Sequence, residues 1–279
     1  MRRKSWKARA ETFSNFVEEA VSHFKIPVDN IAIEFVDWFG AAVIMTDSTE
    51  EVLRLNVGLD SLDCSQDMRR LAWHEVAHWK DGLEGWPLMG FTNPRCSKLK
   101  CVPVDILKYC RSLPTRVSEV EGQSVFYTVN SMVSDVSVCR RIIRTPAYTD
   151  TMFSLANMAA AVQLKGFTRS ELCDLVITTS FNTEYLRFAE NSDEQIHTAA
   201  ERMHKTYSRL LRKIQKKIPE FHIMFEDFRK LWPSIGFTRD SNLLLEWIIE
   251  ATKLIPSEFI SQIAHKTSEN VKIITGDEF

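Results

Sequence analysis

Apolar side chains recur along this chain with two different periods, and the two periods separate predicted strands from predicted helices. Residues 12–24 carry them at three- and four-residue intervals, which predicts an amphipathic helix that ends before Pro27. Residues 65–82 show the same helical period, and Gly82 is typical of a helix C-terminus. Short β-branched or alternating runs between these helices predict strands over 31–36, 41–45 and 52–59.

The second half of the chain is predicted to be mainly helical. Residues 117–144 can form one long helix, because Pro146 stops the pattern only after residue 144. Thr168 and Glu171 have the spacing of a capping box and open a further helix. The other helices are expected over 152–165, from 192–195 onward, and over 202–217, 241–254 and 257–265. Residues 86–104 contain three prolines and little periodicity, which predicts an irregular stretch that could line a cleft.

These elements predict an α+β protein with a small N-terminal mixed sheet followed by a mainly helical C-terminal half. The chain has 279 residues, of which 44% are hydrophobic, so it can bury a substantial core in one or two compact units. We expect an N-terminal α/β subdomain over residues 1–86 and a helical subdomain over 87–279.

The predicted helix over 65–82 contains the sequence His74-Glu75-Val76-Ala77-His78, which is an HExxH pattern. On a helix, His74 and His78 are one turn apart and point the same way. Two imidazoles on one face supply half of a tetrahedral zinc site, and Glu75 beside them could take a proton from a metal-activated water. The alternative interpretation is a pair of surface histidines on an ordinary amphipathic helix.

This pattern, on a helix that follows a small sheet, resembles the zincin superfamily of metallopeptidases, and the resemblance extends over residues 31–144. It implies a zincin-like fold, a Zn²⁺ cofactor and a peptide or protein substrate. It also implies that Glu75 is the catalytic base and that the strand over 52–59 forms the sheet edge that pairs with extended substrate. The activity expected from the resemblance is zinc-dependent hydrolysis of peptide bonds.

A third zinc ligand must come from outside the HExxH pattern. Metzincins continue it with a glycine and a third histidine or aspartate, and this chain has Asp81 and Glu84 at those positions. Gluzincins take a glutamate from a second helix, in patterns such as NExxSD. Residues 130–135 resemble that pattern, since Asn130, Ser134 and Asp135 match it, but Ser131 replaces the glutamate and is a poor zinc ligand.

Asp135 is therefore our expected third ligand, together with His74 and His78, and it leaves one open position for water. Glu84, Glu119 and Glu121 remain alternative ligands. Asp135 could instead orient a histidine by a hydrogen bond, with help from Asn130 and Ser131, or make a buried polar contact between helices.

Charge and hydropathy exclude several classes of partner. The net charge is −2 with 26% charged residues, so no strong overall field recruits nucleic acid, which we do not expect as the main partner. Residues 202–217 are the exception, because a basic face there could bind nucleic acid, an acidic protein or an anionic substrate, or could simply be solvated. No apolar run reaches the roughly 18 residues of a membrane span, and no secretion signal is recognisable, so we expect no membrane partner and a cytoplasmic protein.

The six cysteines are expected to be free thiols, because no secretion signal suggests an oxidising compartment. Cys96, Cys101 and Cys110 form the only cluster, and their spacing fits no strong zinc pattern. A Cys96–Cys101 disulfide is the alternative for a hyperthermophilic source.

A zinc peptidase usually also needs a donor that stabilises the oxyanion. The candidates by chemistry alone are Tyr109, Tyr127, Tyr148, His197 and His204. The alternative to a peptidase is a non-catalytic zincin-like protein, in which a structural metal joins two helices and the helical half binds a partner. A closed site with four protein ligands would favour that alternative.

Overall fold

The computed structural model describes residues 2–27, 30–36, 41–44, 52–58, 65–90, 102–189 and 194–261. The strands are β1 (Asn30–Val36), β2 (Ala41–Ile44), β3 (Val52–Gly58), β4 (Met89–Gly90) and β5 (Val102–Pro103). The helices are α1 (Arg2–Phe24), α2 (Ser65–Leu83), α3 (Ile106–Ser112), α4 (Glu119–Ile142), α5 (Tyr148–Ala161), α6 (Arg169–Asn182), α7 (Glu194–Lys217), α8 (Phe221–Leu231) and α9 (Ser241–Lys253), with short 3₁₀ helices η3 (Thr183–Phe188) and η4 (Trp232–Ser234). The chain is thus mostly helical with a small sheet, which agrees with an α+β description.

The backbone groups into two compact units. One unit contains residues 1–86, 138–162 and 184–210, and the other contains residues 87–137, 163–183 and 211–279. The division expected from the sequence also has a boundary after Trp86. It assigns residues 138–162 and 184–210 to the helical subdomain, whereas in the structure they group with the first unit.

The sheet of the first unit is mixed, with the strand order β1-β3-β2. Strand β3 pairs with β1 in parallel and with β2 antiparallel, and Leu55 faces Ile33 on one side and Val43 on the other. Because β3 has a hydrogen-bonded neighbour on both sides, it is the central strand. The expectation that residues 52–59 form a substrate-pairing edge is therefore wrong, since their backbone groups are already used within the sheet.

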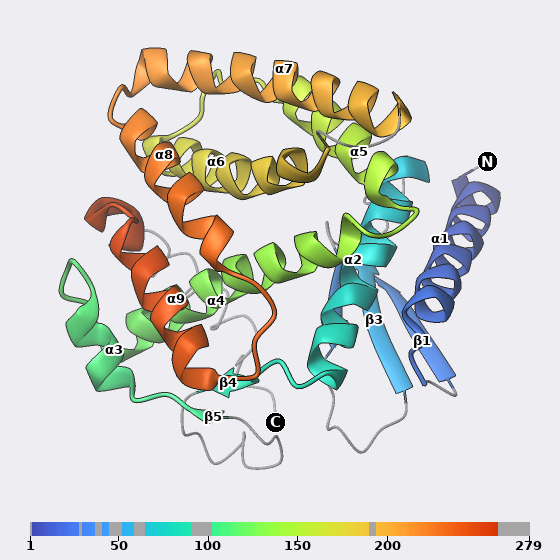
Figure 1. Cartoon of the computed structure of the whole chain (residues 1–279), viewed down its shortest axis with the longest axis horizontal. Coiled ribbons are helices and arrows are strands. Elements are labelled where there is room, and N and C mark those ends of the chain that lie inside the picture. Colours follow the sequence, from blue (N-terminus) through green and yellow to red (C-terminus); the bar gives the residue numbers. More distant parts are fainter. Residues whose placement is uncertain are drawn as a thin grey trace. The chain divides into compact units, whose positions relative to one another are not determined.

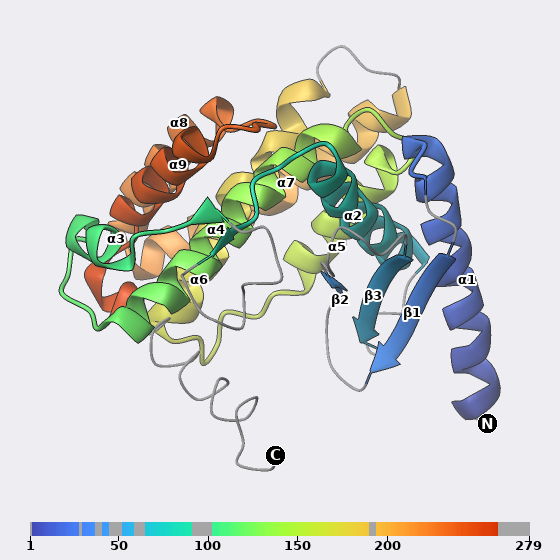
Figure 2. The same cartoon turned by 90° about the horizontal axis from the view of Figure 1, so that it is seen from below.

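Helix α1 lies beside β1 and α2 (Figure 1), and aromatic side chains pack it against both. The rings of Phe13, on α1, and Phe35, on β1, meet edge to face with centroids 6.3 Å apart. Phe24, at the end of α1, packs on the fully buried Trp73 of α2 with a centroid distance of 5.6 Å. Figure 2 shows β1 and β3 side by side, with α1 next to β1. The helical period of residues 12–24 is thus explained by burial, and the helix begins ten residues earlier than that stripe.

Ion pairs and hydrogen bonds hold α2 on its other sides. Arg69 bonds to Glu19 of α1 at 2.5 Å and to Asp150 of α5 at 2.9 Å. Arg70 donates from Nε to the hydroxyl of Ser154, also on α5, at 3.0 Å. These contacts lie one turn before the HExxH residues, so they fix the position of the helix that carries them.

In the second unit, α8 packs against α6 and α9, and α9 also packs against α3. The buried indole of Trp232 donates to the hydroxyl of Ser180 at 2.8 Å, which ties η4 to α6. The predicted capping box is confirmed: Thr168 accepts from the backbone of Glu171, whose carboxylate accepts from the Thr168 backbone. Helices α3 and α8 have no counterpart among the predicted elements.

The stretch expected to be irregular contains a short parallel pair, in which Met89 of β4 faces Val102 of β5. Residues 91–101 between these strands, and with them Cys96 and Cys101, lie outside the described residues. Cys110, Cys139 and Cys173 form no disulfide within the described part of the chain. None of the described helices is both long enough and apolar enough to cross a bilayer.

Candidate metal centre

Two imidazoles of α2 lie against each other on one face of the helix. The Nε2 atoms of His74 and His78 are 3.1 Å apart, and the ring centroids are 4.7 Å apart. The helical spacing of four residues brings the rings together, and both side chains are half-buried. Trp73, Val76 and Ala77 of the same helix are fully buried. Their packing in the core fixes the orientation of the helix face that carries the histidines.

Asp135 approaches the same two rings from α4. One ligand atom from each of His74, His78 and Asp135 can be chosen so that all three lie within 4.8 Å of one another, and all three side chains are half-buried. Ser131, one turn earlier on α4, is exposed. The residue that replaces the glutamate of the gluzincin pattern is thus turned to solvent, while the carboxylate one turn later meets the histidines.

The separation of the two histidine nitrogens is compatible with a tetrahedral zinc site. Two histidine nitrogens that bind zinc at about 2.0–2.1 Å, at a tetrahedral angle, are about 3.3 Å apart. The observed 3.1 Å between the Nε2 atoms is close to that separation. A carboxylate oxygen bound at about 2.0–2.2 Å needs a similar spacing to each nitrogen.

Glu75 follows His74 on α2 and is buried, with 6% of its surface exposed. A buried carboxylate is costly without nearby positive charge. A divalent ion held by two neutral imidazoles and one carboxylate leaves a net charge of +1. The position of Glu75 next to such a centre is therefore electrostatically favourable, in addition to its place in the HExxH pattern.

The alternative ligands have other roles in the structure. Glu84 accepts from Arg141 at 2.5 Å and pairs with Lys80 at 3.1 Å. Burial raises the pKa of Glu84, but the hydrogen bonds and the positive charges of these two partners outweigh it and lower the pKa below its ordinary value. Glu121 accepts from the backbone of Ser118 at 2.7 Å and so caps the start of α4, where Glu119 is exposed.

The five candidate oxyanion donors are distributed over several elements. The hydroxyl of Tyr109 bonds to the hydroxyl of Thr252 at 3.0 Å, and that of Tyr148 donates to the backbone carbonyl of Tyr185. Desolvation by burial raises the pKa of both phenols well above the ordinary value, so both hydroxyls stay protonated. Tyr127, His197 and His204 are exposed.

Sequence reasoning did not anticipate one set of ion pairs between α4 and α2. Arg141, two turns after Asp135 on α4, forms ion pairs with Asp81 and Glu84, which follow His78 on α2. The Asp81 side chain is only 2% exposed. No local pattern connects Arg141 with Asp81, because the two residues are 60 positions apart in the sequence.

No protein-family model, curated protein or solved structure matches this chain. The zincin resemblance is therefore carried by the residues of the two motifs. Of the gluzincin-like motif, Asp135 meets the histidines and Ser134 is half-buried. The amide oxygen of Asn130 is buried and makes no hydrogen bond to the residues that the structure describes.

Proposed function

We propose that this chain is a zinc-dependent metallopeptidase with a zincin-like centre. His74, His78 and Asp135 hold the ion, and Glu75 is the catalytic base. The single observation that carries this proposal is the convergence of the three ligand atoms within 4.8 Å, next to a buried glutamate in the HExxH register.

The number of donors favours a catalytic centre over a structural one. Within the described residues, the cluster contains three side chains and no fourth histidine, cysteine or carboxylate. Structural zinc sites usually use four protein ligands, whereas catalytic sites use three and keep one position open. Two histidines and one carboxylate also suit Fe(II), but the adjacent Glu75 base is the feature expected of a hydrolase.

Zinc in this centre would lower the pKa of a water molecule and polarise the carbonyl of a scissile peptide bond. The protein's own contribution begins with Glu75, which takes one proton from the attacking water. The remaining hydroxide forms the new bond to the carbonyl carbon. Glu75 then gives its proton to the amine nitrogen as the C–N bond breaks, so the base returns to its carboxylate form.

The test is the isosteric substitution Glu75→Gln, which removes the base and keeps the volume. We expect the variant to retain zinc, measured by elemental analysis, and to lose hydrolysis of fluorescein-labelled casein by at least 100-fold. Glu201→Gln, an exposed glutamate on α7, is the matched control and should keep wild-type activity.

Full activity of the Glu75→Gln variant would contradict the mechanism. Iron in place of zinc in the purified chain would overturn the assignment of the metal. Bound zinc without hydrolysis of casein or of a mixed peptide library by the wild type would favour the structural alternative, in which the ion only joins α2 to α4.

A further inference from the structure

Helix α7 has two faces of opposite character. Its apolar face is completely used in the core: Met203, Tyr207, Leu210 and Ile214 are at most 4% exposed. The opposite face carries exposed lysines and arginines, and no aspartate or glutamate occurs between residues 202 and 219. The positive charge of this face is therefore not neutralised within the helix itself.

Four of these cations form a row, which we call the basic row: Lys205, Arg209, Lys213 and Lys216. Their spacings of four, four and three residues place them within a narrow band on the side of the helix opposite the buried face. The row extends over eleven residue steps of helix, which is about 16 Å, and one strand of B-form DNA carries about five phosphates over that length.

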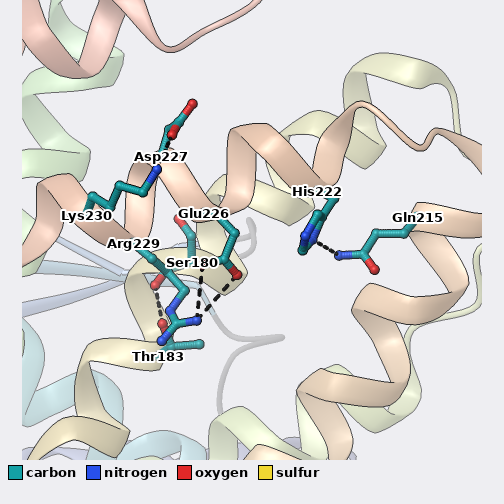
Figure 3. Close-up of polar contacts among 8 residues, drawn as sticks. All are labelled: Ser180, Thr183, Gln215, His222, Glu226, Asp227, Arg229 and Lys230. Carbon is teal, nitrogen blue, oxygen red and sulfur yellow. Dashed lines mark hydrogen bonds and ion pairs between the residues drawn. The ribbon is translucent and has the colours of Figure 1, made fainter.

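The cations of the basic row differ from those of α8, which are paired. Within the described part of the protein, none of the row's four residues forms a salt bridge. On α8, in contrast, Arg229 and Lys230 pair with Glu226 and Asp227 one turn earlier, as Figure 3 shows. The row is thus a local concentration of uncompensated charge on a chain whose net charge is −2.

We propose that the basic row binds the phosphate backbone of duplex nucleic acid, without reading its sequence. A protein partner would need apolar or aromatic anchors, and α7 exposes no large hydrophobic side chain among these cations. An amphipathic helix that lies in a membrane inserts its apolar face, but the apolar face of α7 is buried in the core. A nucleic-acid backbone needs only regularly spaced cations, and the basic row provides them.

The experiment measures fluorescence anisotropy of a labelled 24-base-pair duplex of arbitrary sequence with the full chain, between 25 and 200 mM NaCl. With three or four phosphate contacts, log K should fall with log[NaCl] at a slope of about −3 to −4. Changing the four residues of the basic row to glutamine should weaken binding at least tenfold at 50 mM NaCl and flatten that slope.

The matched control carries Lys108→Gln, Arg229→Gln, Lys230→Gln and Lys253→Gln, which change the net charge equally but leave the basic row intact. It should bind within about twofold of the wild type. If the fourfold variant of the row fails to fold, the pairs Lys205→Gln with Arg209→Gln, and Lys213→Gln with Lys216→Gln, should each lose part of the affinity.

Three results would overturn the proposal. The wild type could show no binding to the duplex at 25 mM NaCl. The control could lose as much affinity as the variant of the row, which would mean that only net charge matters. The row could instead bind poly-glutamate or phosphatidylserine vesicles and not the duplex, which would assign it to a protein or a membrane.

Discussion

The guanidinium of Arg141, on α4, donates a hydrogen bond from Nε to the almost completely buried carboxylate of Asp81, on α2. A second nitrogen of the same guanidinium, Nη2, donates to Glu84 at 2.5 Å. The two acidic residues follow His78 on α2, and Arg141 follows Asp135 on α4. The pairing therefore holds the end of α4 against the end of α2 that lies just beyond the candidate metal ligands.

The first prediction concerns Arg141 as a positioning residue. Arg141→Lys keeps the charge but cannot make both hydrogen bonds in the same geometry, so zinc affinity should fall by roughly tenfold while the fold is retained. Competition with a chromophoric chelator measures the affinity, and circular dichroism checks the fold. Lys253→Arg, on the exposed surface of α9, is the control. Unchanged zinc affinity in Arg141→Lys would show that the ion pair is only structural.

A variant without the guanidinium of Arg141 tests how much a buried Asp81 carboxylate that lacks this partner lowers the free energy of unfolding. Arg141→Met leaves Asp81 charged and without this partner, which should lower the free energy of unfolding by about 3–5 kcal/mol. The double variant Arg141→Met with Asp81→Asn should recover much of that loss, because the buried charge is then absent. Urea denaturation measures both. Equal instability of the single and double variants would refute the role of charge burial.

A pH dependence follows from the lowered pKa of Glu84. Its partners Arg141 and Lys80 stabilise the charged form, so the contribution to stability is complete above the ordinary pKa of 4.5 and is lost as the pH falls through the lower folded-state value. The stability difference between the wild type and Glu84→Gln should be on the order of 1 kcal/mol at pH 6–7 and should shrink below about pH 4.5. A difference that does not change between pH 3 and pH 7 in urea denaturation would contradict this assignment.

The histidine pair should control metal content. We expect one zinc ion per wild-type chain and almost none after His74→Ala or His78→Ala, because two ligands separated by 3.1 Å act on the same ion. Elemental analysis of protein purified in parallel gives the ratio. His204→Ala, an exposed histidine on α7, should bind zinc as the wild type does. Full zinc in the double variant of His74 and His78 would place the metal elsewhere.

Asp135 should be the third ligand. Asp135→Ala is expected to lower zinc affinity at least 100-fold, since it removes the only carboxylate of the cluster, whereas Glu121→Ala should leave the affinity nearly unchanged. Glu84→Ala should lower the zinc affinity only slightly, because it removes one ion-pair partner of Arg141. A metal-bound crystal structure should place an Asp135 oxygen about 2.0–2.2 Å from zinc. Coordination by Glu84, Glu119 or Glu121 instead would refute the ligand set and leave the HExxH pair intact.

Gly122 offers a test of packing at the start of α4. A Cβ at this position would overlap the sulfur of Cys110 on α3. Gly122→Ala should therefore lower the free energy of unfolding by about 1–2 kcal/mol, although alanine favours helix by about 1 kcal/mol. In a Cys110→Ala background the same change should become stabilising. If Gly122→Ala is equally unfavourable in both backgrounds, the sulfur is not the obstacle.

Local patterns in the sequence were sufficient to predict those helices and strands that depend on residues close together in the chain. The helical period of residues 65–82 predicts α2, the capping box predicts the start of α6, and the positions of β1, β2 and β3 agree to within one residue over the described part of the chain. The spacing of His74 and His78 likewise determines that their rings share a face. In each case the information lies within a few residues, because hydrogen bonding and side-chain direction repeat over one helical turn or two strand positions.

Other features were decided only when distant segments packed. The sequence could nominate Asp135 as a ligand, but four carboxylates remained possible, and only the structure groups a ligand atom of Asp135 with those of the two histidines. The central place of β3 and the pairing of Arg141 with Asp81, 60 residues away in sequence, left no local trace either. Strand order and long-range ion pairs depend on which buried surfaces fit together, and a period of hydrophobic positions carries no information about the partner it packs against.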